Sequence, residues 1–359
     1  MVRAAVLTET GASLRVTDID LPEPGPGQVR VKVAATGVCH SDLSLARGTL
    51  RQPVPAVLGH EAAGTVVSLG EGVTSSSVGD RVVLCWAPPC GQCWFCTQSE
   101  PWLCERSSDA AAAPYATYDG MPLYPGLSTA GFAEETVVSA RALVAVPEAV
   151  PLEHAALVGC AVMTGVGAVL NTAKVRAGQS VLVVGLGGVG LSVVQGARLA
   201  GAGQVIVVDR SPDKLALART MGATDALEAG ADLPKRVRAL TERRGTDHAF
   251  DCVGAAATIR DSWASTRRGG MTTIVGIGGK EQTVTFTALE LFHFARTLTG
   301  CVYGSTDPMT DIPTILDHAA QGRLDLASLI SSTIGLADID EAFADMEKGI
   351  GARAVVVPG

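Results

Sequence analysis

The sequence has few aromatic residues and little charge, at 4% and 18% of its residues, and it contains no run of basic side chains. Its formal net charge is −8, so we expect no nucleic-acid partner. The longest apolar run, "VLVVGLGGVGLSVVQGARLA", is interrupted by glycines and closed by Arg198, which argues against a membrane span. The first residues, "MVRAAVLTETG", lack the apolar core and small-residue cleavage site of an export signal. We therefore expect a cytoplasmic protein that binds no membrane.

What the sequence does contain is enough apolar material for two domains, since 47% of its 359 residues are hydrophobic. The first part of the chain has short β-branched runs such as "QVRVKVAATGV" and "DRVVLC" between turn residues, which predicts a β-rich, barrel-like domain. Further on, the apolar runs "SVLVVG", "QVIVVD", "HAFDCVG" and "MTTIVGI" alternate with helical segments such as "SPDKLALARTMGA", where Ser211 is the expected N-cap. This alternation predicts a doubly wound parallel sheet, and the chain as a whole is of the α/β class.

The segment "VVGLGGVG" has the spacing Gly185-x-Gly187-x-x-Gly190 between a predicted strand and a predicted helix. Asp209 ends the next strand, 19 residues after the last glycine, which completes the fingerprint of a dinucleotide-binding turn. The glycines allow a tight turn, a close approach of the pyrophosphate and close helix packing, while the helix N-terminus attracts the phosphates. Asp209 can accept hydrogen bonds from ribose hydroxyls and repels a 2′-phosphate. We therefore expect NAD rather than NADP, although the neighbouring Arg210 weakens this preference.

Four cysteines are crowded into "CGQCWFCTQSEPWLC", at Cys90, Cys93, Cys96 and Cys104. Disulfides are rare in the cytosol, where such density indicates metal binding or redox chemistry. Four thiolates suit a closed tetrahedral zinc site, which is structural rather than catalytic. A redox pair needs only two of them, and an iron–sulfur cluster commonly has other spacings. We favour structural zinc over these two alternatives.

Three further donors are scattered along the chain, namely Cys39 in "GVCHSD", His60 in "LGHEAAG" and Cys160 in "LVGCAVMTG". Each one alone is more often an ordinary core residue than a metal ligand. Together, two thiolates and one imidazole form a known ligand set of catalytic zinc, with the fourth position open. The acids Asp42 and Glu61 lie close to these donors in the sequence, where hydrogen-bond partners of the imidazole or the metal are expected. The alternative for both acids is a solvated surface charge.

With these motifs the sequence resembles the zinc-dependent alcohol dehydrogenases of the medium-chain dehydrogenase/reductase family, from about residue 3 to residue 357. The resemblance also rests on "GHEAAGTVVSLG", "GLGGVGLS" and "VVDRSPDKLALA", in this order. It implies a GroES-like catalytic domain at 1–161 and 303–359 and a Rossmann domain at 162–302. It also implies NAD and two zinc ions per subunit. The catalytic zinc would be held by Cys39, His60 and Cys160 beside Asp42 and Glu61, and the structural zinc by Cys90, Cys93, Cys96 and Cys104.

The resemblance assigns the remaining site residues to three groups. Ser41 would bind the proton of the substrate oxygen, and Leu50, Trp86 and Val302 would line the substrate pocket. The cofactor would contact Gly185, Gly187, Gly188, Val189, Gly190, Asp209, Arg210 and Lys214, with His40 and Arg353 at the pyrophosphate and Thr164, Val275 and Ile277 at the nicotinamide. An arginine is common in the family where His40 stands, so the affinity for the cofactor is expected to differ.

The implied reaction is hydride transfer from a zinc-bound alkoxide to NAD, which gives an aldehyde or ketone, or the reverse. The apolar pocket residues favour primary alcohols or aldehydes of small to medium size, aromatic ones included, over polyols. Leu50 offers no polar group to a glutathione adduct. Many relatives continue the proton relay through a histidine at the position of Ser44; here the relay ends at ribose and water, or His40 substitutes.

Two other functions fit parts of the sequence. One is a zinc-independent quinone or enoyl reductase of the same fold, but such relatives lack both cysteine sets. The other is a non-catalytic, zinc-stabilised NAD-binding protein, against which the open ligand set argues. Two zinc ions per chain would support the dehydrogenase, one the binding protein and none the reductase. The family also suggests a homodimer or homotetramer that pairs through the strand in "RTLTGCVYG".

Overall fold

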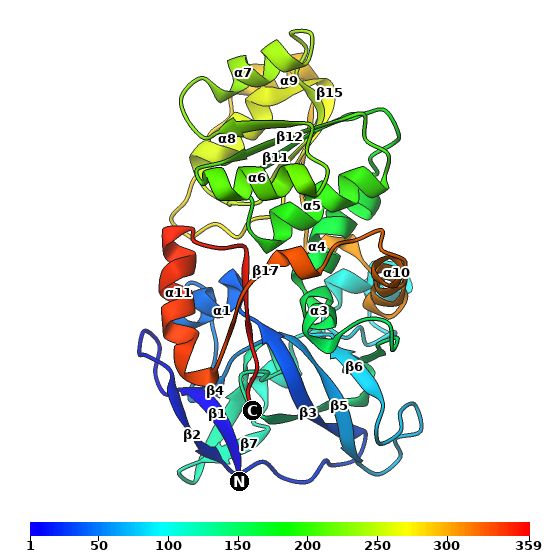
Figure 1. The fold of residues 1–359 in the computed structure, drawn as a ribbon, viewed down its shortest axis with the longest axis vertical. Coiled ribbons are helices and arrows are strands. Elements are labelled where there is room, and N and C mark those ends of the chain that lie inside the picture. The colour runs from blue at the N-terminus through cyan, green and yellow to red at the C-terminus, as the bar shows by residue number, and fades with distance from the viewer. The chain divides into compact units, whose positions relative to one another are not determined.

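The computed structural model describes residues 1–359, which divide into two compact units. Unit 1 contains residues 1–161 and 307–359, and unit 2 contains residues 162–306. The sequence had placed the second boundary after residue 302, so unit 2 extends four residues further than expected. Unit 1 contains two sheets and unit 2 contains one (Figure 1). Each unit has its own hydrophobic core.

Unit 1 is built on two sheets. The first has the strand order β2-β1-β4-β8-β7, and the second has the order β10-β6-β5-β3-β18-β17, with β9 also paired to β3. Along β3 the buried residues Val29, Val31 and Val33 alternate with more exposed ones, as expected for a strand with one face on a core. The strands are β1 (Val2–Leu7), β2 (Arg15–Ile19), β3 (Gln28–Gly37), β4 (Ala56–Val57), β5 (Glu61–Leu69), β6 (Arg81–Leu84), β7 (Ala116–Tyr118), β8 (Met121–Pro125), β9 (Glu135–Ser139), β10 (Leu143–Ala145), β17 (Ile330–Ile334) and β18 (Arg353–Val356).

The helices of unit 1 lie between or beside these strands, and they range from the single turn of α2 to the 13 residues of α10 (Figure 1). A larger core joins β1, β4 and α11 through Val6, Val57 and Phe343, and the predicted β-rich domain is thus confirmed. The helices are α1 (His40–Ala46), α2 (Trp94–Thr97), α3 (Leu152–Ala156), α10 (Pro308–Ala320) and α11 (Ile339–Lys348), while α4 (Ala161–Gly167) begins at the boundary with unit 2.

Unit 2 contains the predicted doubly wound sheet, with six parallel strands in the order β13-β12-β11-β14-β15-β16. The helices α5 and α6 pack on β11 and β12 from one side, and α7 and α8 cover the other side (Figure 1). Ser211 is the N-cap of α6, as predicted, and its Oγ accepts from the N–H of Lys214. The elements are β11 (Ser180–Val184), α5 (Gly188–Leu199), β12 (Gln204–Asp209), α6 (Pro212–Thr220), β13 (Asp225–Glu228), α7 (Leu233–Leu240), β14 (Thr246–Asp251), α8 (Ala256–Ser265), β15 (Thr266–Ile274), α9 (Ala288–Phe294) and β16 (Thr297–Gly300).

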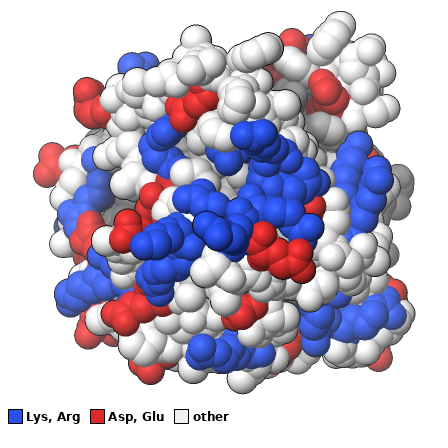
Figure 2. Space-filling model, turned by 90° about the horizontal axis from the view of Figure 1, so that it is seen from above, with Lys and Arg blue, Asp and Glu red and all other residues white.

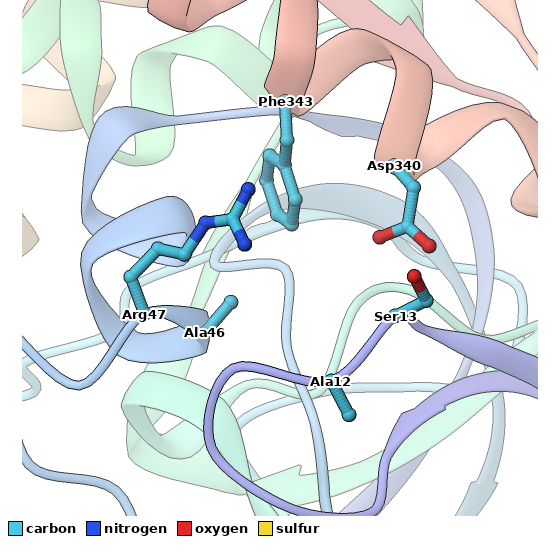
Figure 3. A pocket seen from close by; sticks show the side chains of 6 residues that line it. All are labelled: Ala12, Ser13, Ala46, Arg47, Asp340 and Phe343. Carbon is cyan, nitrogen blue, oxygen red and sulfur yellow. The ribbon is translucent and has the colours of Figure 1, made fainter.

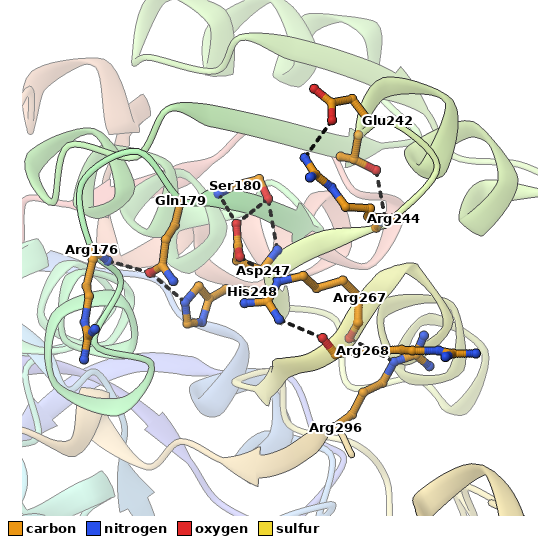
Figure 4. A network of polar contacts seen from close by, with 12 residues as sticks. Arg176, Gln179, Ser180, Glu242, Arg244, Asp247, His248, Arg267, Arg268 and Arg296 are labelled. Atoms are coloured by element: carbon orange, nitrogen blue, oxygen red, sulfur yellow. Dashed lines mark hydrogen bonds and ion pairs between the residues drawn. The ribbon is translucent and has the colours of Figure 1, made fainter. Parts of the chain in front are cut away.

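A polar network joins the amino ends of three strands in unit 2 (Figure 4). Asp247 on β14 accepts from both the N–H and the Oγ of Ser180 on β11, each at 2.8 Å, and from Nε of Arg267 on β15 at 2.7 Å. The hydrogen bonds to Ser180 and the Arg267 guanidinium outweigh burial and lower the pKa of Asp247. Asp247 therefore holds the edge of the sheet that lies opposite the dinucleotide turn.

The two units differ in charge. Unit 2 contains 16 lysines and arginines against 11 aspartates and glutamates, whereas unit 1 contains 12 against 25. Figure 2 looks onto the face of unit 2 that carries α7 and α9, and Lys and Arg side chains gather in its middle. Arg243, Arg244 and Arg268 are exposed, and the guanidinium of Arg296 stacks 4.4 Å from the ring of Phe294. Unit 1 therefore carries a net charge of −13 and unit 2 a net charge of +5, which together give the −8 of the chain.

No single helix is both long and apolar enough to cross a bilayer. Only the bent pair Leu152–Gly159 and Ala161–Thr172 meets that test together, by length and composition alone.

Candidate metal centres and dinucleotide site

The four-cysteine loop folds so that all four thiols converge. Cys93 is the N-cap of α2 and Cys96 lies within that helix, so one helical turn directs both sulfurs to the same side. The Sγ atoms of Cys90 and Cys96 are 4.0 Å apart, and those of Cys93 and Cys104 are 3.9 Å apart. Four sulfurs placed 2.3 Å from one tetrahedral ion would be separated by about 3.8 Å. The loop therefore fits zinc without rearrangement.

Backbone N–H groups support negative charge on these sulfurs. Cys104 Sγ accepts from the N–H groups of Cys90 at 3.2 Å and Arg106 at 3.4 Å, and Cys90 Sγ accepts from Cys93 N–H at 3.3 Å. The N–H of Gln92 is the main cause that lowers the pKa of Cys90 to about 6. A thiolate is the form that binds zinc, so these hydrogen bonds favour the ligating state of Cys90, whereas burial raises the pKa of Cys96.

The second donor set is assembled by the pairing of two strands. Gly37 at the end of β3 pairs with Glu61 at the start of β5, so the residues just outside this pair, Cys39 and His60, lie close together. A Cβ at Gly37 would overlap the carboxylate of Glu61, so only glycine leaves room there. Cys160 joins them from the turn before α4. The ligand atoms of Cys39, His60, Glu61 and Cys160 all lie within 4.8 Å of one another, and all four residues are buried.

Asp42 orients the imidazole of His60. Its Oδ1 lies 2.9 Å from His60 Nδ1 and accepts from Gly59 N–H at 2.9 Å, while its Oδ2 accepts from the N–H of Cys39 at 3.2 Å. Nδ1 therefore carries the proton, and Nε2 offers its lone pair. That Nε2 is buried and has no hydrogen-bond partner, although it lies beside two thiols. A buried nitrogen of this kind is costly unless a further group binds it, so the donor set fits a zinc ion with one position left open.

The negative charge of this donor cluster is balanced by a buried arginine of unit 1. Arg353 on β18 is 5% exposed, donates to the carbonyl oxygen of Val38 at 2.9 Å, and lies 3.2 Å from Glu61 Oε1. Burial raises the pKa of Glu61 to about 8, although Arg353 opposes the rise. A hydrogen bond from the Cys160 thiol lowers the pKa of Cys39 well below its ordinary value. Burial alone would lower the pKa of His60, but Asp42 and Cys39 raise it.

The other predicted residues of unit 1 lie around this cluster. Ser41, in the first turn of α1, has its Oγ 3.8 Å from Cys39 Sγ. The ring of Trp86 meets the imidazole of His60 edge to face, with centroids 6.4 Å apart. Leu50 is partly buried against the larger core, and His40 is exposed at the start of α1.

A separate pocket of unit 1 contains none of the predicted residues (Figure 3). It has a volume of about 160 Å³ and lies at the end of α1 opposite Cys39. Arg47, which directly follows α1, and Asp340 in α11 face it (Figure 3). Asp340 already accepts from the N–H of Leu14 at 3.0 Å. The pocket is lined by Ala12, Ser13, Ala46, Arg47, Asp340 and Phe343.

In unit 2 the glycine-rich turn has the conformation that its sequence predicts. Gly185 has φ +90°, and the side chain of Val253 occupies the place of a Cβ. A Cβ at Gly190 would overlap the carbonyl oxygen of Gly185, whereas a Cβ at Gly187 would meet open space. Gly187 therefore leaves a free approach to the N-terminus of α5, which begins at Gly188, and this is the cradle that a pyrophosphate requires.

Asp209, the last residue of β12, lies at the same edge of the sheet as the glycine-rich turn. Its Oδ2 accepts from Leu186 N–H at 2.7 Å and its Oδ1 from Ser211 N–H at 2.9 Å, so the carboxylate is fixed beside the turn. Burial lowers the pKa of Lys214, whereas Asp209 nearby opposes the shift and Arg210 adds to it. The three predicted ribose-side residues thus lie within electrostatic reach of one another.

The remaining predicted cofactor and substrate residues of unit 2 differ in exposure. Thr164 is buried in α4, and Val189 is partly buried in the first turn of α5. Val275 is partly buried just after β15, while Ile277 and Val302 are 52% and 51% exposed. The sequence did not single out Asp251, which is fully buried at the end of β14. The available signal was an aspartate at the end of an apolar strand, the same signal that identified Asp209.

Comparisons with known proteins agree with this geometry. The family described as "Alcohol dehydrogenase GroES-like domain" matches residues 25–148, and the family described as "Zinc-binding dehydrogenase" matches residues 188–321. An S-(hydroxymethyl)glutathione dehydrogenase of Escherichia coli O1:K1 is 38% identical over 99% of both chains. Benzyl alcohol dehydrogenase of Acinetobacter calcoaceticus has a TM-score of 0.92 and 29% identity, covering 100% of this chain and 99% of that one. A zinc-binding dehydrogenase of Sinorhizobium meliloti 1021 bound to NADP has a TM-score of 0.85 and 27% identity, with the same coverage. The chain belongs to the zinc-dependent alcohol dehydrogenases of the medium-chain dehydrogenase/reductase family.

Proposed function

We propose that this dehydrogenase oxidises primary alcohols of small to medium size, aromatic ones included, with NAD, and that it also catalyses the reverse reduction. The observation that carries the proposal is the buried Nε2 of His60, which lies with the sulfurs of Cys39 and Cys160 while Asp42 holds the other ring nitrogen. These three donors would hold the catalytic zinc. When bound, zinc supplies a Lewis acid that makes an alcohol hydroxyl acidic near neutral pH.

Ser41 is the proposed first acceptor of the hydroxyl proton. Its Oγ lies 3.8 Å from Cys39 Sγ, in the fixed first turn of α1. NAD, when bound, would accept the hydride from the carbinol carbon, while Ser41 Oγ would accept the proton of the hydroxyl oxygen and pass its own proton on. Ser41→Ala should therefore slow single-turnover hydride transfer by at least ~10²-fold while the zinc content is unchanged. A smaller effect would remove Ser41 from the mechanism.

The substrate proposal rests on large apolar side chains near the proposed zinc donors. The indole of Trp86 lies against the imidazole of His60, and Leu50 provides no hydrogen-bonding group. One relative acts on S-(hydroxymethyl)glutathione by its name and another on benzyl alcohol, so the two substrates provide the direct test. We expect a higher kcat/KM for benzyl alcohol than for S-(hydroxymethyl)glutathione, both measured by NADH absorbance. The opposite order would establish the glutathione adduct as the substrate instead.

NAD is proposed over NADP because the Asp209 carboxylate is held beside the glycine turn by two backbone N–H groups. Its negative charge would repel the 2′-phosphate of NADP. Arg210 and Lys214 lie close to it and moderate that repulsion, so the preference is one of degree. The ratio of kcat/KM for the two cofactors tests it.

A homodimer is the proposed assembly. Strand β16 forms the edge of the unit 2 sheet, and unpaired edges readily add a strand from another chain. The preceding helix α9 exposes Leu289, Leu291 and Phe292 at 72%, 45% and 84%, an apolar surface of the kind that interfaces cover. Leu298 on β16 is 39% exposed. We expect Phe292→Glu combined with Leu298→Arg to convert a dimer to monomer in light scattering, and a monomeric parent protein would contradict the assembly.

A reducing compartment such as the cytoplasm is proposed from the cysteines. All nine are free thiols, and six of them are placed as zinc donors that act as thiolates. Oxidation would remove both metal centres. Loss of zinc on mild oxidation, with recovery after thiol reduction and added zinc, is the expected behaviour.

A further inference from the structure

Asp251 connects two loops, one through its side-chain carboxylate and the other through its main-chain oxygen. Its side-chain Oδ1 accepts from Gly254 N–H at 2.6 Å and from Val253 N–H at 3.3 Å, in the loop that follows β14. Its main-chain oxygen accepts from Val275 N–H at 2.8 Å and Gly276 N–H at 2.9 Å, in the loop that follows β15. The residue is 0% exposed, so both sets of hydrogen bonds are shielded from water.

The two loops are also interlocked by their glycines. Gly254 has φ +84°, and a Cβ there would lie 2.6 Å from the backbone carbon of Ile277. A Cβ at Gly276 would in turn overlap the backbone of Val253 and Gly254. Val253 also packs its side chain against Gly185 of the dinucleotide turn. A shift of the loop after β14 is therefore transmitted to both neighbouring loops.

These loops lie at the edge of the sheet where a dinucleotide binds. The strand order reverses between β11 and β14, because β12 and β13 follow on one side of β11 and β14 to β16 on the other. In doubly wound sheets the ligand crosses this point, outside the carboxyl ends of the strands. Asp209 on β12 marks the adenosine half, so the loops after β14 and β15 face the nicotinamide half.

We propose that Asp251 is a positioning residue for NAD. Its carboxyl group fixes the loop after β14 and, through the close packing of Gly254 and Gly276, also the loop after β15, in the arrangement that receives the nicotinamide half. The proposal rests on the proposed dehydrogenase function, because it presupposes that NAD binds at this edge. Asp251 acts through Val253 and Val275 and touches neither cofactor nor substrate. Asn at this position keeps an oxygen that can accept from the N–H groups of Val253 and Gly254, whereas Ala leaves both groups without an acceptor.

Strand β14 offers a matched control at its other end. Asp247 also accepts backbone and side-chain hydrogen bonds, which are part-buried, but at the amino ends of the strands, whereas the dinucleotide turn follows the carboxyl end of β11. Figure 4 shows these bonds. Asp251→Ala and Asp247→Ala both remove a carboxylate with hydrogen bonds from the same strand. A purely structural role for Asp251 would make the two variants behave alike.

The experiment measures NADH binding by fluorescence titration, together with the thermal midpoint of the cofactor-free protein, for the parent, Asp251→Ala, Asp251→Asn and Asp247→Ala. We expect Asp251→Ala to raise the Kd of NADH at least ~10-fold. The Kd of Asp251→Asn should stay within about 3-fold of the parent value. Asp247→Ala should lower the thermal midpoint without changing the Kd. Equal changes in Kd for the two alanine variants, or no change for Asp251→Ala, would overturn the proposal. Failure of the parent to bind NADH would instead contradict the proposed function.

Hydrogen exchange provides the second readout should Asp251→Ala prove poorly folded. In Asp251→Asn and Asp251→Ser, the amides of Val253, Gly254, Val275 and Gly276 report the loops directly. We expect protection close to the parent in the Asn variant. In the Ser variant we expect the largest loss at Val253 and Gly254, which lose their side-chain acceptor, and a smaller loss at Val275 and Gly276, which keep the main-chain oxygen, in step with weaker NADH binding. Unchanged protection in both variants would also overturn the proposal.

Discussion

The carboxylate of Asp42 and the imidazole of His60 form a hydrogen bond of 2.9 Å between two fully buried side chains, His60 Nδ1 to Asp42 Oδ1. Asp42 also accepts from the N–H groups of Gly59 and Cys39, so it ties the imidazole to the start of α1. We expect Asp42→Asn to lower the zinc affinity of this centre by about 10- to 100-fold, because it removes the charge that keeps Nε2 basic. Competition with a chromophoric chelator measures the change, and the zinc of the four-cysteine loop, which Asp42 does not contact, is the internal control. An unchanged affinity would show that the hydrogen bond only supports the fold.

The four-cysteine loop should contribute stability and not chemistry. Cys104 accepts N–H groups from Cys90 and Arg106, and it is buried. Cys104→Ala should therefore reduce the zinc content from two ions to one per chain and lower the thermal midpoint by several degrees. The rate of hydride transfer per remaining catalytic zinc should stay within a few-fold of the parent, as measured by single turnover with metal analysis. A loss of chemistry at full catalytic-zinc occupancy would give this loop a role in the reaction.

Asp209 should control the choice between the two cofactors. Replacement by Asn keeps an acceptor for Leu186 or Ser211 but removes the charge. We expect Asp209→Asn to lower kcat/KM for NAD by about 10-fold. The ratio of kcat/KM for NADP to kcat/KM for NAD should rise by a larger factor, because a carboxylate no longer opposes the 2′-phosphate. Steady-state kinetics with both cofactors measures this, and Asp213→Asn on the exposed first turn of α6 is the control. An unchanged ratio would assign the discrimination to other residues.

Much of the architecture could be predicted because local patterns dictate it. The apolar run of β11, the glycines after it and the aspartate at the end of β12 specify a strand, a turn and a second strand in one order. The N-cap of α6 follows from Ser211 and Pro212 in the same local way. The four cysteines are close in sequence, so their convergence needs only one helical turn.

The features that could not be predicted depend on contacts between distant segments. Cys39 and His60 meet because Gly37 pairs with Glu61, a register that neither motif specifies alone. The role of Asp251 depends on how two loops pack, and its sequence context resembles that of any aspartate after a strand. The separation of charge between the units was likewise hidden in the total of −8, because only the fold defines which residues belong to each unit.

The stability of unit 2 should depend on pH through Asp247. Its pKa is lowered in the folded protein by Ser180 and Arg267, so the folded state binds the proton less readily than the unfolded chain. The stabilisation is therefore fully present above the ordinary aspartate pKa of about 3.9 and is lost as the pH falls through the lower folded value. We expect Asp247→Asn to reduce the free energy of unfolding of unit 2 by about 1–2 kcal/mol at pH 7, and by progressively less as the pH falls below 4. The thermal midpoints of parent and variant between pH 7 and pH 3 measure this effect. A difference in midpoint that stays constant over this range would mean that the carboxylate charge does not hold β11, β14 and β15 together.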